Sequence, residues 1–164
     1  MPGCYLSSFS AKGDDFEVDR FLRRSDLKTD IIGRRGETIG SGKRKRRSSS
    51  FCVYIGDDDR RASWYFERAE RFLRQWQKDI RKLQRDPSVT ELRLEFVSYR
   101  RTEGVQSDVL PASLLKLAGS LGVDIEWSLY PNAKELSFPI PRRAPKLARA
   151  LLKKMKDSAV VRPA

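Results

Sequence analysis

The sequence predicts an α+β fold in which a single, mainly antiparallel sheet has its helices packed on one face. Three patterns lead to this prediction. Residues 51–55 and 90–99 alternate apolar and polar side chains, as one-faced strands do, and residues 62–85 repeat apolar side chains at the helical period. Strands that are buried on both faces, as in parallel sheets, have continuous runs of apolar residues. Because these strands alternate instead, a largely antiparallel sheet is expected.

The first part of the chain predicts a strand, a helix and a short extended segment. Residues 4–9 alternate well enough for a strand. A helix follows to about Arg24, and either Asp14 or Asp15 can cap its start because an aspartate side chain accepts a backbone N–H. Residues 27–32 are then a candidate for a short extended segment.

The middle of the chain predicts a strand followed by the longest helix. Residues 51–55 form the strand, and a helix over about 62–85 ends at Asp86-Pro87, since proline cannot continue it. The expected inward side chains are Phe51, Val53 and Ile55 of the strand, and Tyr65, Ala69, Phe72, Trp76, Ile80 and Leu83 of the helix.

The last part predicts a strand over 90–99, a helix over 110–121 and a closing strand over 123–130, so that the whole order is β-α-β-α-β-α-β. Pro111 can start the helix and Gly122 can stop it. The expected inward residues are Leu92, Leu94 and Phe96, then Leu114, Leu117, Ala118 and Leu121, then Val123, Ile125, Trp127 and Leu129. Outward charges on the two strands, Glu91, Arg93 and Glu95 opposite Asp124 and Glu126, predict a cross-strand ladder.

The length of 164 residues suits one hydrophobic core. We expect residues 1–131 to form a single domain with a basic loop at 33–50, and residues 132–164 to form a proline-bounded linker and a basic helical tail. No segment reaches the roughly 18 apolar residues of a membrane span, and the first residues lack a secretory pattern. A cytoplasmic location and no membrane partner are therefore expected.

The chain has no histidine, which removes histidine-based nucleophile systems, histidine-bound zinc and the usual general base. We expect no enzymatic activity, no cofactor and no metal, and two buried thiols at Cys4 and Cys52. Consecutive aspartates at 57–59 favour a turn before a helix over a cation site. An enzyme using carboxylates alone stays open, and it would need residues 57–59 in one cleft with Glu91 or Glu95.

Two segments carry nearly all of the net charge of +12. Residues 34–47 hold seven basic residues and one acid, for +6, and residues 141–164 hold eight and one, for +7. The remaining chain carries +12 minus +13, or −1. The candidate polyanion-binding residues are Arg34, Arg35, Lys43, Arg44, Lys45, Arg46 and Arg47 in the loop, and Arg142, Arg143, Lys146, Arg149, Lys153 and Lys154 in the tail.

The basic loop has two interpretations. Five consecutive cations flanked by glycine and serine can follow a phosphate backbone and gain from counterion release, but a mobile, solvated loop without a partner has the same composition. A phosphate-loop motif is not expected, because five residues separate Gly36 from Gly42 where the motif has four, and Arg44 replaces its hydroxyl residue.

Aromatic residues offer a second type of nucleic-acid contact, base stacking. Tyr65, Trp76 and Trp127 fall on predicted inner faces, where core packing is expected. Trp64 and Tyr99 are expected to be more exposed.

The order of elements resembles a family of small bacterial proteins, domain of unknown function 4279. The likeness covers roughly residues 4–131 and lies in the opening strand and helix, IIGRRGE before a strand, the long helix, and LPASLLKLAGSLGVDIEWSLYP. Phe51 stands where a tryptophan is common in that family, and the KRKRR run and the tail look like additions. The resemblance implies a compact α+β domain and supplies no catalytic residues.

These observations favour a non-enzymatic bacterial protein that binds nucleic acid or another polyanion through its basic loop and tail. The alternative is a protein-interaction role, such as an immunity- or inhibitor-type protein that binds an acidic partner protein. An exposed sheet edge would also allow a homodimer.

Overall fold

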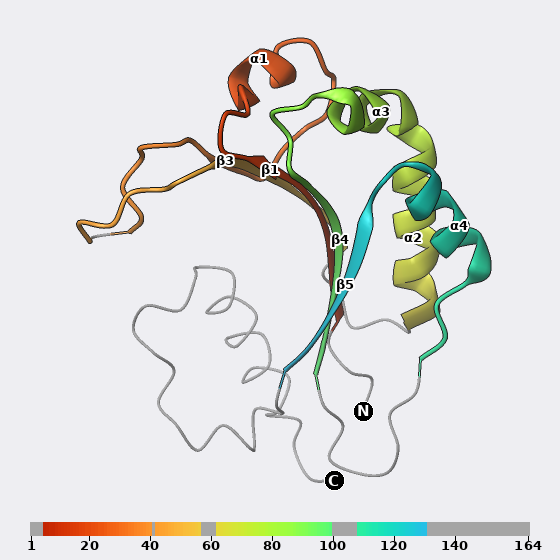
Figure 1. The fold of residues 1–164 in the computed structure, drawn as a ribbon. Coiled ribbons are helices and arrows are strands. Elements are labelled where there is room, and N and C mark those ends of the chain that lie inside the picture. Colours follow the sequence, from red (N-terminus) through yellow and green to blue (C-terminus); the bar gives the residue numbers. More distant parts are fainter. Residues whose placement is uncertain (1–4, 41, 57–61, 100–107, 131–164) are drawn as a thin grey trace, which may run out of the picture.

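A five-stranded sheet forms the centre of the molecule, with helices beside it (Figure 1). The computed structural model describes residues 5–40, 42–56, 62–99 and 108–130. From the amino end the elements are β1 (Tyr5–Gly13), α1 (Val18–Leu22), β2 (Ile31–Gly33), β3 (Ser49–Gly56), α2 (Ala62–Gln75), α3 (Gln77–Arg85), β4 (Glu91–Tyr99), α4 (Ala112–Ser120) and β5 (Asp124–Tyr130).

The sheet is mixed, with the strand order β2-β3-β1-β4-β5. β1 pairs antiparallel with β3 and β4, and β2 pairs antiparallel with β3, whereas β5 runs parallel to β4. The α+β class is confirmed, but the prediction of a mainly antiparallel sheet was wrong. The reason is α4, which lies in the connection from β4 to β5; such a crossover returns the chain in the direction in which it left.

The core lies between the sheet and the helices that cover one of its faces (Figure 1). Phe9 of the central strand has no exposed surface, and its ring centroid lies 6.2 Å from that of Phe51 and 5.5 Å from that of Phe72. Fully burying one such side chain contributes about 1.5–3 kcal/mol. The inward residues expected from alternation in β3 and β4 are all buried, so this part of the pattern is confirmed.

Two element boundaries differ from the expected ones. β1 continues to Gly13 because it has a partner strand on each side, and this places Asp14 outside the following helix. α1 begins only at Val18, after Glu17, whose side chain makes no capping hydrogen bond, so the expected cap at Asp14 or Asp15 was wrong.

The predicted element order also differs from the observed one. The short extended candidate contains a true strand, β2, because its backbone pairs with β3. The long helix is divided at Trp76 into α2 and α3, although the hydrogen bonds from Trp76 N to Phe72 O and from Ile80 N to Trp76 O continue across the bend. β5 is an edge strand, which leaves Leu129 55% exposed despite its predicted inward position.

The opposite face of the sheet is polar over β4 and β5. Arg93 forms ion pairs with Glu91, at 2.9 Å, and with Glu126 of the neighbouring strand, and the Ser128 hydroxyl donates to Glu95 at 3.1 Å. The expected charge ladder is therefore confirmed. In this ladder Arg93 contacts one carboxylate on its own strand and one on the next strand.

Cys52 and Tyr54 lie on this same face, where Tyr54 packs against the small apolar pair Leu6 and Val97. Cys52 is a free, half-buried thiol, and burial raises its pKa although a hydrogen bond with Ser8 opposes that shift. Burial likewise raises the pKa of Tyr54 to about 12. Cys4 lies outside the described residues.

Two further searches cover the described ranges only. None of their helices combines the length and apolar character that crossing a membrane requires. The same ranges contain no group of three Cys, Asp or Glu side chains placed to hold a metal ion. The aspartates at 57–59 lie outside the described residues, so their predicted turn stays a prediction.

Candidate nucleic-acid interface

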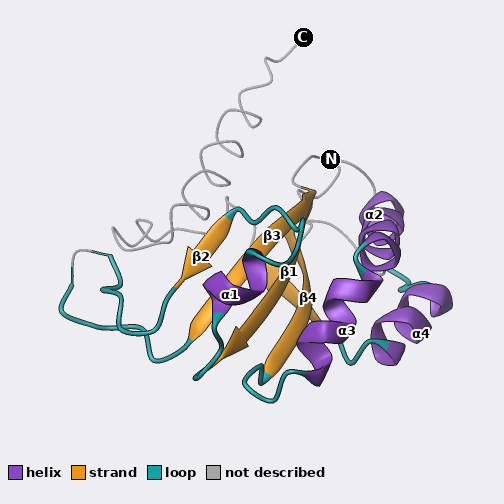
Figure 2. Cartoon of the chain, turned by 90° about the horizontal axis from the view of Figure 1, so that it is seen from above, coloured by secondary structure: helices purple, strands orange, loops and turns teal. Residues whose placement is uncertain are grey.

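The basic loop between β2 and β3 is a hairpin that projects beyond the sheet (Figures 1 and 2). Its two arms are hydrogen-bonded: Gly36 N donates to Arg46 O at 2.9 Å, and Arg46 N donates to Glu37 O at 2.8 Å. Further out, Ile39 N donates to Arg44 O at 2.8 Å. The segment expected to be a mobile loop is therefore an ordered extension of the β2–β3 pair.

Glycine conformation explains how this charged segment can turn back on itself. Gly36 has φ +85°, and it is the third residue of a turn closed by the hydrogen bond from Glu37 N to Arg34 O at 3.1 Å. A positive φ at this position favours glycine because it has no Cβ. Gly40, near the far end, has φ +64°.

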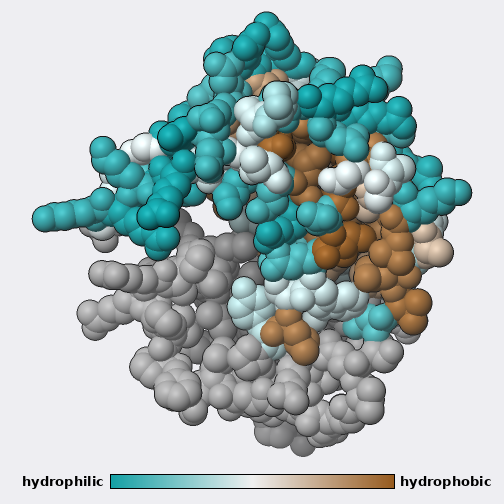
Figure 3. All heavy atoms as spheres, in the orientation of Figure 1, coloured by the Kyte–Doolittle hydropathy of each residue, from teal (hydrophilic) through white to brown (hydrophobic). Residues whose placement is uncertain are grey.

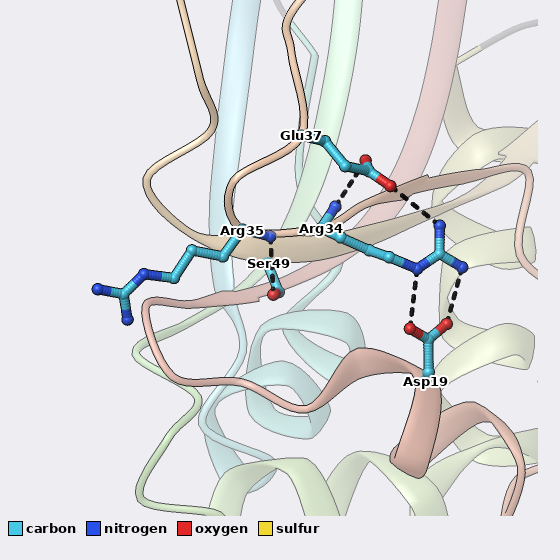
Figure 4. A network of polar contacts seen from close by, with 5 residues as sticks. All are labelled: Asp19, Arg34, Arg35, Glu37 and Ser49. Atoms are coloured by element: carbon cyan, nitrogen blue, oxygen red, sulfur yellow. Dashed lines mark hydrogen bonds and ion pairs between the residues drawn. The ribbon is translucent and has the colours of Figure 1, made fainter.

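Arg34 fastens the hairpin to α1 (Figure 4). Its Nε and Nη2 donate to the two carboxylate oxygens of Asp19, each at 2.8 Å, and its Nη1 donates to Glu37 at 3.1 Å. Its backbone N–H also donates to Glu37, at 2.9 Å. Hydrogen bonding to Arg34 lowers the pKa of both carboxyl groups and raises that of Arg34. The Arg34 guanidinium is therefore hydrogen-bonded to two carboxylates, and its charge is not available to neutralise a phosphate.

Arg35 is also engaged, on the other side of the chain. Its side chain extends away from Arg34 (Figure 4), and its Nη1 donates to Asp15 at 2.6 Å and to the Asp14 carbonyl at 3.2 Å. Its backbone N–H donates to the Ser49 hydroxyl at 3.2 Å. Arg35 thus connects the hairpin to the segment that follows β1.

Arg46 packs across the backbone of β2. A Cβ placed on Gly33 would lie 2.8 Å from the Cζ of Arg46, so the guanidinium lies directly against this glycine. Arg46 is half-buried, and its charge helps to lower the pKa of Glu37 after the larger effect of Arg34. We refer to Arg34, Arg35 and Arg46 together as the hairpin base.

The other four cations of the segment, Lys43, Arg44, Lys45 and Arg47, form what we call the hairpin tip. All four side chains are exposed, and none of them forms an ion pair with any residue in the described ranges. A space-filling view shows the hairpin as a hydrophilic arm away from the apolar surface beside the helices (Figure 3). The structure thus divides the seven predicted residues into three whose side chains contact other parts of the domain and four that have no ion-pair partner in the described ranges.

The predicted residues of the tail lie outside the described ranges, so the structure does not bring them to the hairpin or away from it. They are Arg142, Arg143, Lys146, Arg149, Lys153 and Lys154.

Sequence reasoning missed a second region of positive charge. The net charge of the chain outside the two basic segments is near zero, but this charge is unevenly distributed. Residues 62–85, which form α2 and α3, hold seven basic and three acidic residues, or +4. The acidic residues that offset them lie elsewhere, including Glu91, Glu95 and Glu126 on the open face of the sheet. Counting charge element by element, instead of over the whole domain, would have found this asymmetry.

Comparisons of the chain with models of known families, with curated proteins and with solved structures find no match. The resemblance to domain of unknown function 4279 therefore stays a prediction, and the functional argument depends on the geometry alone.

Proposed function

We propose that this protein is a non-enzymatic nucleic-acid-binding protein and that its hairpin tip contacts the phosphate backbone. One observation carries the proposal: the four tip cations have no carboxylate partner in the described ranges, while the base cations are held by acids or by packing. Unpaired, solvent-exposed cations on an ordered arm can each neutralise a phosphate and release a bound counterion. No base-specific contact is needed for such binding.

The number of unpaired cations sets the expected salt dependence. Four phosphate contacts give a slope of log affinity against log salt of about −3 for a single strand, and slightly steeper for a duplex. Seven contacts, the number that the sequence alone suggests, would give about −5 to −6. The measured slope therefore distinguishes an interface made by the tip from one made by every cation of the segment.

The tail is proposed to add further phosphate contacts, because it carries the second concentration of positive charge. Its contribution would raise the slope beyond the value set by the tip. Replacing the six tail residues by serine in the full chain separates the two contributions, because it leaves the hairpin sequence intact.

Fluorescence-polarisation titrations of single- and double-stranded DNA and RNA at several salt concentrations test the proposal. The informative variant replaces all four tip residues by serine, which lowers the net charge from +12 to +8. A matched control replaces four exposed cations elsewhere, Arg24, Lys28, Arg81 and Lys116, and has the same net charge.

We expect the tip variant to lose most of its affinity and about three units of slope at fixed probe length, and the control to retain both. Equal losses in the two variants would mean that only net charge matters. Absence of binding at low salt would exclude the proposal and leave the protein-interaction alternative, for which the outcome is a stoichiometric acidic partner whose recovery survives nuclease treatment.

A further inference from the structure

An open pocket of about 420 Å³ lies where α2 crosses β3. This volume falls within the range of about 300–1,000 Å³ that small-molecule sites occupy. Tyr54 and Ile55 line it from β3, and the α2 side contributes Trp64, Arg68, Arg71, Phe72 and Gln75. These α2 residues are spaced four, three, one and three apart, so they follow one side of the helix.

The inner wall of the pocket is an aromatic ring with a guanidinium stacked on it. The Cζ of Arg68 lies 4.6 Å from the centroid of the Trp64 ring, within cation–π distance. Trp64 lies close against β3 at Gly56, where an added Cβ would be 3.1 Å from its Cζ3. Gly56 therefore lets the ring sit against the strand, and the ring in turn supports a flat guanidinium surface.

The outer wall is positive and polar. Arg71 and Gln75 are exposed on the next turns of α2, and among the residues that the structure describes no carboxylate lines the pocket. The nearby acid Glu70 is directed elsewhere, since it accepts hydrogen bonds from Arg74 at 2.6 Å and from Ser113 of α4 at 2.8 Å. The lining thus combines a stacked planar surface, an available guanidinium and an amide. The acid next to its Tyr54 wall, Asp30, accepts the Tyr54 backbone N–H at 2.7 Å.

A planar ring attached to an anion matches this combination. Nucleobases stack on aromatic rings and on arginine guanidinium planes, and a neighbouring phosphate needs a cation. An amide such as that of Gln75 can both donate to and accept from a base edge. Bases within a duplex are already stacked on each other, so only an unpaired base can enter such a pocket.

We propose that the pocket binds one nucleotide unit of a single strand, with its base on the Arg68–Trp64 pair and its phosphate on Arg71. This inference rests on the proposed nucleic-acid function and deepens it. β3 connects the two sites: the hairpin joins its first residue, Ser49, and the pocket adjoins Ile55, six residues or roughly 20 Å further along. A single strand that spans this distance and the length of the arm can contact the hairpin tip and fill the pocket.

Two strands of equal length test the pocket separately from the phosphate contacts. The first is a single strand of about 12 nucleotides, within the site sizes that single-strand-binding folds use. The second has the same backbone with abasic sites throughout, so it keeps every phosphate and offers nothing to stack. The wild-type chain is expected to bind the base-bearing strand roughly 5- to 150-fold more tightly, the effect of stacking one base.

Three variants locate this preference. Arg68→Ser removes the stacked guanidinium and Arg71→Ser the phosphate partner, whereas Arg81→Ser removes an exposed cation of α3 that does not line the pocket. All three lose one charge, so their affinities for the abasic strand serve as the electrostatic baseline. We expect the preference for bases to fall in R68S, where only the Trp64 ring is left for stacking, and to be unchanged in R81S. In R71S, affinity for the base-bearing strand falls more than in R81S.

The outcomes separate the two levels of the proposal. Equal wild-type affinity for the two strands overturns the pocket and leaves the hairpin function standing, as does a preference that is as large in R68S as in the wild type. Binding of neither strand at low salt overturns both. Arg71 is exposed, so R71S is expected to fold. Its affinity for the base-bearing strand therefore tests the phosphate contact even if R68S fails to fold.

Discussion

The base and the tip of the hairpin both consist of basic residues, but their side chains have different surroundings. At the base, Arg34 and Arg35 reach back to carboxylates that precede them by 15 and 20 residues, and Arg46 packs on a glycine of β2. The four tip cations are exposed and have no such partners in the described ranges. The number of cations in a basic segment therefore overestimates how many can bind phosphate, because some of them already contact carboxylates or pack against the fold.

The two regions depend on each other. Exposed ion pairs contribute little to the free energy of unfolding, so the ion pairs of the hairpin base are no major source of stability. Its role is geometric, because a bidentate guanidinium–carboxylate pair fixes direction as well as distance. The base holds the arm in one orientation, and the tip then presents its charges from a defined place.

The largest expected effect concerns the core beneath the hairpin base. Phe51 begins the buried part of β3 and stacks on Phe21 of α1, with ring centroids 5.7 Å apart and planes at 3°. We expect Phe51→Ala to lower the free energy of unfolding by about 3–5 kcal/mol, because it leaves a cavity among aromatic rings. Urea denaturation measures this loss.

The four-serine tip variant provides the contrast in the same measurement. Its substitutions lie on the surface, so each is expected to change the free energy of unfolding by no more than about 0.5 kcal/mol. A loss comparable to that of Phe51→Ala would show that the tip cations hold the fold, and the division between base and tip would then be wrong.

The core positions could be predicted from sequence because local periodicity encodes them. Phe51, Val53 and Ile55 alternate with polar neighbours, and they are buried as that alternation requires. The direction of β5 has no such local signal: its residues alternate equally well in a parallel or an antiparallel strand. Only the crossover through α4, a matter of three-dimensional path, makes it parallel to β4.

The candidate site was less predictable for the same reason. The ion pair between Arg34 and Asp19 joins residues that are 15 apart in the sequence, and no motif or spacing predicts it. Trp64 was expected to be more exposed than it is, because its support by Gly56 and Arg68 depends on how α2 crosses β3. The sequence shows where the positive charge is concentrated. It does not show which of these cations contact other parts of the domain and which have no ion-pair partner.

An intermediate effect is expected at the glycine of the hairpin base. Gly36 has φ +85° and open space around its Cα, so Gly36→Ala adds backbone strain without a steric clash. We expect the substitution to destabilise the arm by about 1–2 kcal/mol, the cost of a left-handed conformation for an L-residue. Protection of the Arg46 amide from hydrogen exchange, which depends on its hydrogen bond to Glu37, should fall by one order of magnitude or so.

Gly42 is the matched control at the tip. It has no positive φ, and a Cβ there would meet its nearest neighbour at 3.7 Å, an ordinary contact. Gly42→Ala should therefore leave Arg46 protection unchanged. Equal effects at both glycines would mean that the two ends of the hairpin open together, as one loose loop.

The smallest effect is the response of the hairpin base to acid. Hydrogen bonding to Arg34 holds the pKa of Asp19 below 3.8 and that of Glu37 below 4.5, their ordinary values. A lowered pKa means that the folded state favours the ionised carboxyl, so this contribution is complete above the unfolded values and disappears as the pH falls through the lowered ones. We expect the amide NMR signals of Gly36 and Arg46 to stay constant from pH 7 to about 5 and to shift below about 4.

The double variant Asp19→Asn, Glu37→Gln determines whether these two groups cause the shift, because neither replacement can titrate. In this variant the signals of Gly36 and Arg46 should already differ from wild type at pH 7, and they should change little on acidification. The control Asp26→Asn alters an exposed acid with no ion pair in the described ranges, so it should keep the wild-type response. If the double variant also kept that response, the arm would owe its orientation to backbone pairing, Arg35 and Arg46, and the tip would present its charges without any help from Arg34.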